Sequence, residues 1–173
     1  MKISKVNTAI HQIVAAYKAK LLHYPEAVFQ ATPPIAGWSY SEVYSHIFDS
    51  SILSVMALEN CIAGKAEQQK TAFAVKLILF FGSLPPQKYK VPSRLADRVK
   101  KITKVEALSF IHQFENALTK AHPGIAQADA NQKTKHPRLG YLNAKQWLRF
   151  IEIHLKHHLK QLNRIEKSFL HSI

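Results

Sequence analysis

The sequence contains a single cysteine, Cys61, among its 173 residues. It therefore cannot form an internal disulfide or a metal cluster held by several thiolates, and a reducing, cytoplasmic location is the plain expectation. Its longest unbroken apolar runs, Leu77–Phe81 among them, are far shorter than a membrane-spanning helix, and polar residues interrupt the N-terminal segment at every turn. We therefore expect neither a transmembrane helix nor a signal peptide, and no membrane partner.

Acidic residues are scarce: 11 stand against 24 lysines and arginines, which gives a formal net charge of +13. A balance of this sign favours anionic partners, either nucleic acid or an anionic substrate. No RNA-binding aromatic motif, zinc-finger spacing or clear helix-turn-helix accompanies it, so we interpret it as a solvated basic surface, with nucleic-acid binding as the less favoured alternative. One denser basic group lies within residues 87–104 and consists of Lys88, Lys90, Arg94, Arg98, Lys100, Lys101 and Lys104.

The length and the 47% hydrophobic content suffice for one domain, residues 1–173, with an ordinary packed core. Apolar residues recur at three- and four-residue steps in four segments, which predicts four long helices. The first runs from Ile3 to about Phe29 and is expected to kink or end at Pro25. The second begins at a capping box, Ser39–Glu42, and ends near Ile62.

A second capping box, Thr103–Glu106, begins the third helix, which closes at His122. A polar loop of about twenty residues follows, a length that is uncommon in compact domains and often functional. Asn143–Gln146 then caps the fourth helix, whose pattern covers Tyr141–Ile165. These boundaries leave a long insert, residues 64–101, between the second and third helices.

The insert is irregular in pattern. Residues 71–81 can form a short, very apolar helix, and residues 87–101 are predicted to form a crossover or lid. Strand-like alternation is nearly absent from the chain, although a short hairpin could lie between Lys88 and Val91. The predicted fold class is therefore all-α: a four-helix bundle with crossover connections and an irregular insert between helices two and three.

Three histidines fall on core-facing positions of two helices. His154 and His158 are one turn apart on the apolar stripe of the fourth helix, so their ring nitrogens can converge on one metal ion. His46 lies on the apolar face of the second helix and could supply a third ligand. Such a site would leave a position open for water or substrate and suits zinc or nickel, with iron or manganese also tolerated. The alternative is that these are core-edge histidines bonded to the backbone or to each other.

The other candidates carry weaker signals. His157 lies on the shoulder of the stripe and His136 precedes a proline in the loop that enters the fourth helix, where it could line the mouth of a pocket. Asp49, one turn after His46, is either an acceptor for a ligand histidine or a surface carboxylate. The position of Glu152 on the helix, about opposite His154, predicts that its side chain is solvated. The large aromatic side chains of Trp38 and Trp147 are expected to anchor the core, and Cys61 is expected to be a small buried residue.

Two segments carry a resemblance to a known family. Gly37–Asp49, GWSYSEVYSHIFD, and His136–Leu162, HPRLGYLNAKQWLRFIEIHLKHHLKQL, are similar to the Trp-Ser…His…Asp segment and the final H-x-x-x-H helix of the DinB/YfiT-like superfamily. The resemblance implies a four-helix bundle, often dimeric, that holds a divalent metal. It assigns the metal ligands to His46, His154 and His158.

The resemblance also implies a range of possible functions. Some relatives are S-transferases or isomerases that use low-molecular-weight thiols, whereas many have no known activity. We therefore expect a divalent-metal-binding protein that acts on a small-molecule substrate as a metal-dependent hydrolase or a thiol-dependent S-transferase, with a homodimer as its expected assembly. The alternative is a non-catalytic basic helical module that binds nucleic acid or a protein partner. Metal affinity is expected to fall below about pH 6.5, where ordinary imidazoles become protonated.

Overall fold

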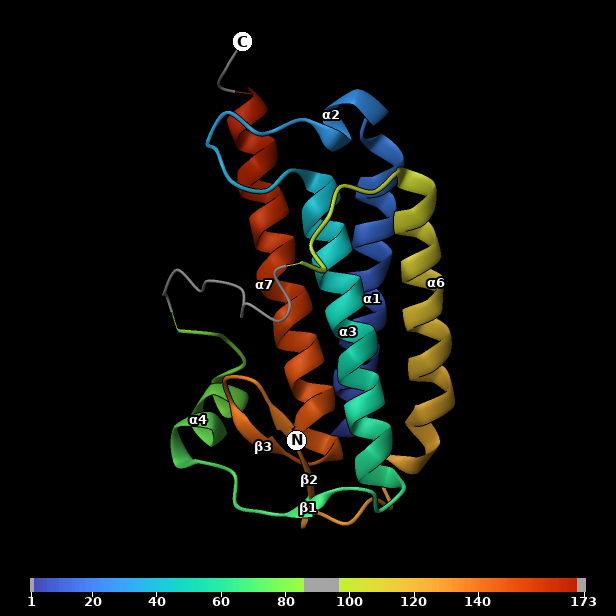
Figure 1. Cartoon of the computed structure of the whole chain (residues 1–173), viewed down its shortest axis with the longest axis vertical. Coiled ribbons are helices and arrows are strands. Elements are labelled where there is room, and N and C mark those ends of the chain that lie inside the picture. The colour runs from blue at the N-terminus through green and yellow to red at the C-terminus, as the bar shows by residue number, and fades with distance from the viewer. Residues whose placement is uncertain (1, 86–96, 171–173) are drawn as a thin grey trace.

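The computed structural model describes residues 2–85 and 97–170. In this part of the chain, four long helices lie side by side as a bundle (Figure 1). They are α1 (Ile3–His23), α3 (Tyr40–Ile62), α6 (Lys104–Ala121) and α7 (Ala144–Leu170). Helix α3 packs against both α6 and α7, and α1 packs against α7. The predicted four-helix bundle is therefore confirmed.

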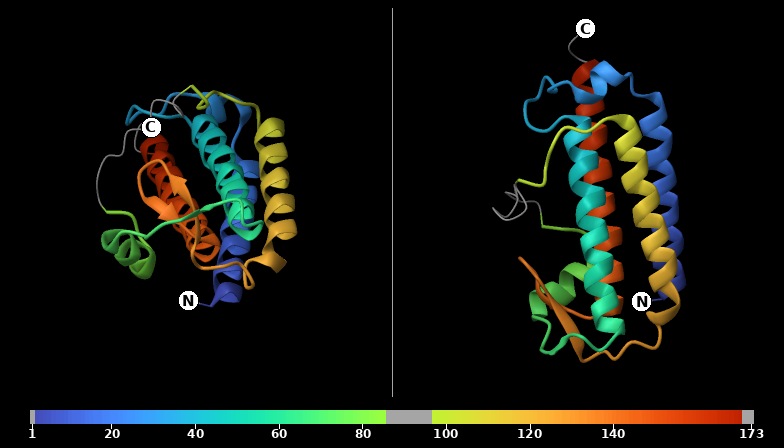
Figure 2. Two further views of the ribbon diagram at one scale, coloured as in Figure 1. Left: turned by 60° about the horizontal axis from the view of Figure 1, so that its bottom comes forward. Right: turned by 45° about the vertical axis from the view of Figure 1, so that its right-hand side comes forward.

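The direction of the helices explains the long insert. In Figure 1, α1 and α7 run upward, whereas α3 and α6 both run downward. The chain leaves α3 at the lower end of the bundle and enters α6 at the upper end, so the connection between them crosses the length of the bundle. Of the segment predicted to form a crossover or lid, residues 87–96 lie outside the described residues, and the second view of Figure 2 shows the described chain that enters α6 passing beside α3. None of the described helices is long and apolar enough to cross a membrane.

Reciprocal caps begin three of the long helices where the sequence predicts them. The Ser39 hydroxyl accepts a hydrogen bond from the Glu42 amide, and the Glu42 carboxylate accepts one from the Ser39 amide. Thr103 and Glu106 exchange the same pair of bonds. Asn143 and Gln146 do so as well through their side-chain amide oxygens. These bonds satisfy backbone donors that the first helical turn leaves free, so they fix the residue at which each helix begins.

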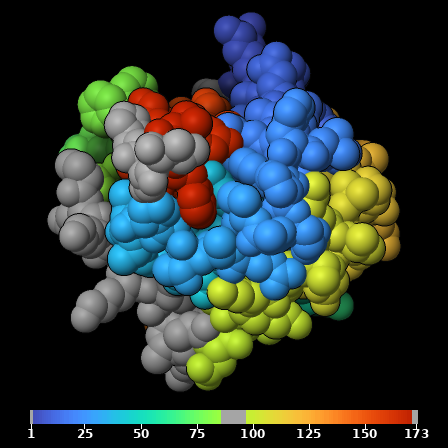
Figure 3. Space-filling model, turned by 90° about the horizontal axis from the view of Figure 1, so that it is seen from above, coloured from blue at the N-terminus to red at the C-terminus, as the bar shows by residue number. Residues whose placement is uncertain are grey.

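The upper end of the bundle is closed by a short helix. Helix α1 ends before Pro25, as predicted, and α2 (Glu26–Gln30) follows it. Tyr24 stacks on Tyr40 with ring centroids 4.1 Å apart, and Phe29 packs against Tyr44. Figure 3, which looks down on this end, shows α2 and the loop after it lying over the bundle beside the end of α7.

A small sheet, two strands of which lie in the polar loop before α7, accompanies the predicted helical bundle. Strands β1 (Glu67–Gln68), β2 (Gln132–His136) and β3 (Gly140–Leu142) form a small antiparallel sheet in the order β1-β2-β3. The hairpin turn has a physical signal in the sequence: Pro137 follows β2, and Gly140 adopts a left-handed φ of 71°. The hairpin considered at Lys88–Val91 lies outside the described residues.

The predicted short helix of the insert is present as α4 (Phe73–Phe81). It ends at Gly82, which has a φ of 71° that favours glycine. Its inner face buries Val75 and Leu79 on the bundle, whereas its outer face exposes apolar side chains, namely Phe73, Leu77, Phe80 and Phe81. The first view of Figure 2 shows α4 outside the bundle, beside α7.

Glu152 is buried, which corrects the prediction that it is solvated. Only 3% of the residue is exposed. Its carboxylate pairs with Arg149 and, at 2.6 Å, with the Nζ of Lys156. The Arg149 Nε in turn donates to the carbonyl of Leu79 at 3.0 Å, so this cluster attaches α4 to α7. Periodicity placed Glu152 correctly, opposite His154, but that face of α7 is covered by the insert instead of by water.

We expect Glu152→Ala to lower the free energy of unfolding of the metal-free protein by about 3 kcal/mol, because it leaves the largely buried Arg149 cation without its partner. The matched control is Lys156→Ala, which removes the more exposed partner and should cost below about 1 kcal/mol. Urea unfolding of both variants measures the difference. A Glu152→Ala cost as small as that of the control would show that the carboxylate is solvated after all.

Candidate metal centre

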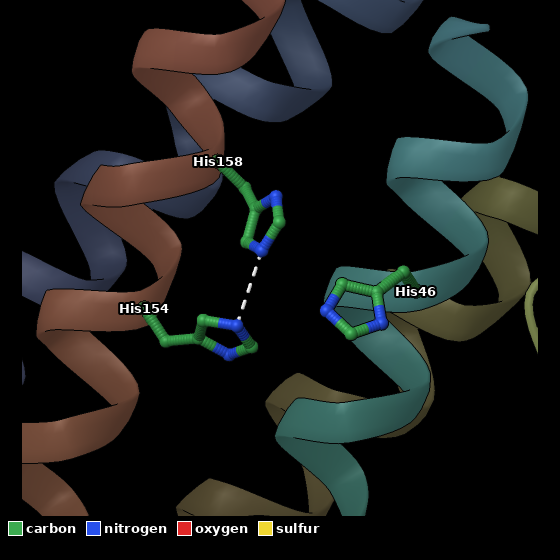
Figure 4. A group of neighbouring side chains, drawn as sticks. All are labelled: His46, His154 and His158. Carbon is green, nitrogen blue, oxygen red and sulfur yellow. Dashed lines mark hydrogen bonds between the residues drawn. The ribbon is translucent and has the colours of Figure 1, made fainter. Parts of the chain in front are cut away.

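His46 reaches the interior from the second turn of α3. The capping box at Ser39 fixes the start of the helix, and the phase of the helix then turns His46 toward α7. The residue is half-buried. Figure 4 shows one of its ring nitrogens facing the gap between the two helices, where the imidazoles of His154 and His158 lie.

His154 and His158 reach the same gap from α7. They are one turn apart, and their Nε2 atoms lie 3.1 Å from each other. The His46 ring lies 5.4 Å from the His154 ring and 4.9 Å from the His158 ring, centroid to centroid. One ring nitrogen from each residue can be chosen so that all three lie within 4.8 Å of one another. The structure thus brings together the three histidines that the sequence singled out.

The distance between His154 and His158 is close to what a tetrahedral metal ion requires, whereas the three ligand nitrogens as a set are more widely spaced. Metal–nitrogen bonds of about 2.0–2.1 Å at tetrahedral angles place ligand nitrogens about 3.3 Å apart. The His154–His158 distance of 3.1 Å is near this value. The three ligand nitrogens all lie within 4.8 Å of one another, so on binding no pair of them would have to approach by more than about 1.5 Å. Rotation of the side chains can supply this movement. The donor set is therefore compatible with a divalent ion and leaves one tetrahedral position for another ligand.

Aromatic side chains wall the cluster. Trp38 stacks on His158 at 6.3 Å and contacts His46 at 5.0 Å, while Phe150 stacks on His154 at 5.2 Å. The sequence predicts that Trp38 and Trp147 anchor the core. Trp147 is buried and donates through its Nε1 to the Thr134 hydroxyl at 2.7 Å, which confirms that prediction, whereas Trp38 is half-buried and also covers the histidines.

Burial keeps the three imidazoles neutral. It lowers the pKa of His46 to about 4, although the nearby carboxylate of Asp49 opposes the shift. Burial, followed by the neighbouring imidazoles, also lowers the pKa values of His154 and His158 well below the ordinary histidine value. Neutral imidazole is the form that binds metals, so the free protein already holds these side chains in the required charge state.

His158 has a further partner that sequence reasoning missed. Its Nδ1 lies 2.8 Å from the Oε1 of Gln161, three residues later on α7. The sequence contains a signal for this contact, because His158 and Gln161 are three residues apart and such residues lie on the same face of a helix. However, glutamine is so common on helix surfaces that spacing alone does not distinguish this contact from a solvated side chain.

Asp49 does not serve as an acceptor for a ligand histidine. Its two carboxylate oxygens accept hydrogen bonds from Arg98, one of them from Nε at 2.7 Å. Arg98 belongs to the predicted basic group, and Lys104 of the same group donates to the carbonyl of Tyr24 at 2.6 Å. These two cations therefore have partners within the protein, while Lys88, Lys90 and Arg94 lie outside the described residues.

His136 and His157 lie near the cluster but outside it. The Nδ1 of His136 accepts hydrogen bonds from the backbone amides of Arg138 and Leu139, so this residue stabilises the hairpin turn. Burial lowers its pKa to about 4. His157 is half-buried, and its ring meets the His158 ring edge-on at 5.1 Å. Burial and the cations of Arg164 and Lys160 lower its pKa too.

Cys61 is buried, as predicted, at the far end of α3 from His46. Its sulfur lies 3.5 Å from the Thr134 hydroxyl and 3.5 Å from the Leu142 carbonyl. It therefore belongs to the contact between α3 and the hairpin and not to the histidine cluster.

Comparison with known proteins supports the fold. A scan with protein-family models finds no match, and a search of curated protein sequences finds none either. Among solved structures, TT2238, described as a four-helix bundle protein, matches with a TM-score of 0.61 and 19% sequence identity, covering 94% of this chain and 99% of that one. A histidine-to-alanine mutant of the mycothiol-dependent maleylpyruvate isomerase matches with a TM-score of 0.60 and 10% identity, covering 92% of this chain.

These matches show which architecture the chain shares with solved structures. The chain spans 60% of the length of the isomerase, so the bundle corresponds to only part of that protein. At these identities the comparison establishes a shared bundle architecture. This architecture is the one that the resemblance of the two sequence segments implies, and the three histidines that the resemblance names lie together in it.

The lowered histidine pKa values predict how the metal-free protein responds to acid. The unfolded chain takes up protons below about pH 6.5, whereas the buried imidazoles take them up only at lower pH, so stability is complete above this value and falls as the pH decreases. Each of His46, His136, His154 and His158 contributes up to about 1.4 kcal/mol per pH unit in this range.

Urea unfolding in the presence of a chelator, from pH 7 to pH 5, measures this loss. His46→Leu removes one of the imidazoles, so its stability should decrease less steeply with falling pH than that of the wild type. A wild-type stability that stays level between pH 7 and pH 5 would contradict the burial of neutral imidazoles.

Proposed function

We propose that the chain binds one divalent metal ion through His46, His154 and His158, and that this centre is catalytic. The observation that supports the proposal is the convergence of three neutral imidazoles from two helices within 4.8 Å. Histidine nitrogens suit zinc and nickel, and also iron or manganese when other ligands complete the shell. Three protein ligands and one open position are typical of catalytic zinc sites, whereas structural sites are usually closed by four.

The charges around the cluster favour an anionic ligand or substrate. All three donors are neutral, and the nearby carboxylate of Asp49 is already paired with Arg98. The positive charge of an ion held here would therefore not be balanced by a protein ligand. A divalent ion in this position would act as a Lewis acid that lowers the pKa of a bound water or thiol. Trp38 and Phe150 would restrict the access of bulk water to the reacting group.

The two reactions expected from the sequence are hydrolysis and thiol-dependent transfer. The structural similarity to a mycothiol-dependent isomerase supports the second, with a low-molecular-weight thiol as co-substrate. The residues that would carry the function are the three histidines as ligands, with Trp38 and Phe150 as the walls of the site. The lowered pKa values of the histidines should also shift the loss of metal affinity from about pH 6.5 to more acidic values.

The metal site is tested by elemental analysis of protein purified without an affinity tag or chelator. We expect close to one ion per chain in the wild type and loss of the ion in His46→Ala and in the double variant His154→Ala/His158→Ala, because each removes a necessary donor. His157→Ala is the matched control: it removes a neighbouring histidine outside the cluster and should retain the ion. A metal-free wild type that also fails to take up added zinc or nickel would refute the proposal.

The thiol hypothesis is tested by calorimetric titration of a low-molecular-weight thiol into the protein. We expect binding at least tenfold tighter to the zinc-loaded wild type than to the chelator-treated protein, because the uncompensated charge of the ion favours an anionic ligand. The metal-depleted His46→Ala variant should behave like the chelator-treated wild type. Equal affinity with and without the ion would remove the support for thiol chemistry and leave hydrolysis as the expected reaction.

A further inference from the structure

We propose that Gln161 is the positioning residue of this centre: it holds His158 in the tautomer that presents Nε2 to the metal. The inference rests on the proposed function, because it assigns a role toward the same ion. Gln161 does not touch the gap between the three imidazoles itself. It acts through the opposite edge of the His158 ring, where its Oε1 lies 2.8 Å from Nδ1.

The chemistry of this contact determines where the proton of His158 lies. With the Gln161 side chain oriented as in the structure, its carboxamide oxygen faces Nδ1; because this oxygen only accepts hydrogen bonds, the contact assigns the hydrogen to Nδ1. Neutral imidazole is the form that binds a metal, and it has a single N–H group. The Nε2 of His158 is therefore left with a free lone pair, and this is the nitrogen that points toward His154.

The contact between the two histidines of α7 completes the assignment. The Nε2 atoms lie 3.1 Å apart, and a hydrogen bond between them requires one donor and one acceptor. Because His158 is the acceptor, His154 must donate through its own Nε2. In the metal-free protein the triad is therefore asymmetric: His158 is ready to bind an ion, whereas His154 must move its proton from Nε2 to Nδ1 before it can bind through that atom.

Gln161 is well placed for this role. His158 is 7% exposed, so water has little access to replace a lost acceptor at Nδ1. Within residues 2–85 and 97–170, Gln161 is the one side chain that forms a hydrogen bond with a triad histidine from outside the triad. Groups that bond the far nitrogen of a ligand histidine fix its orientation, and their removal commonly costs 10–100-fold in metal affinity.

The test measures zinc affinity by competition with a chromophoric chelator. Gln161→Met keeps the size of the side chain but removes the acceptor, so its affinity should fall about 10–100-fold. Gln161→Glu retains an acceptor at this place and should bind zinc at least as tightly as the wild type. Lys160→Ala changes an exposed neighbour on the same turn and serves as the matched control, with unchanged affinity. Thermal unfolding of the metal-free variants verifies that each is folded.

A second readout does not depend on the metal. Nitrogen-15 NMR of the histidine side chains in the metal-free protein should show His158 protonated at Nδ1 in the wild type and in Gln161→Glu. In Gln161→Met this preference should be lost, because nothing else fixes the tautomer. A wild-type His158 protonated at Nε2, or a Gln161→Met variant with wild-type zinc affinity, would overturn the assignment.

The two readouts separate this inference from the proposed function. If the wild type binds no metal, the proposed function fails, and the NMR spectrum still decides whether Gln161 sets the tautomer. If the wild type binds zinc and Gln161→Met binds it equally well, the metal site stands and the role of Gln161 is refuted.

Discussion

The burial of three imidazoles between α3 and α7 is the constraint on which the site depends. Taking a polar ring out of water is unfavourable unless it stays neutral and finds partners. Here burial lowers the pKa of each ring, one histidine bonds another, and Gln161 bonds the outer edge of His158. His46 receives no comparable bond from the described residues and contributes ring contacts alone. The hydrogen-bonding capacity of the three rings is thus only partly used by the protein. A metal ion that binds the remaining ring nitrogens would therefore stabilise the cluster.

The positions of the ligands are set by features far from the chemistry. The capping pairs at Ser39 and Asn143 determine where α3 and α7 begin, and the helical period then determines which side chains face the gap. A hydrogen bond from the Tyr17 hydroxyl to the carbonyl of Leu155, at 2.9 Å, fixes α7 to α1 next to His154. Because none of these bonds involves a ligand side chain, the helices that carry the ligands are positioned whether or not an ion is present.

These local rules explain how much the sequence could predict. Periodicity and spacing identify His154 and His158 as a pair and place His46 on a buried face. They cannot show that α3 and α7 are neighbours, because helix adjacency depends on the whole chain; here it came from the resemblance to a family. The hairpin was missed because its strands are short and polar, and Glu152 was misjudged because a helix pattern shows that a face is polar but not whether another element covers it.

The same reasoning assigns a structural role to the insert. At its start, α4 is attached to α7 through Arg149, which bonds Leu79 and pairs with the buried Glu152. At its end, the chain is attached to α3 next to His46: Arg98 pairs with Asp49, and the Ser41 hydroxyl donates to the carbonyl of Ile102 at 2.7 Å. The insert is therefore anchored to both of the helices that carry the ligands.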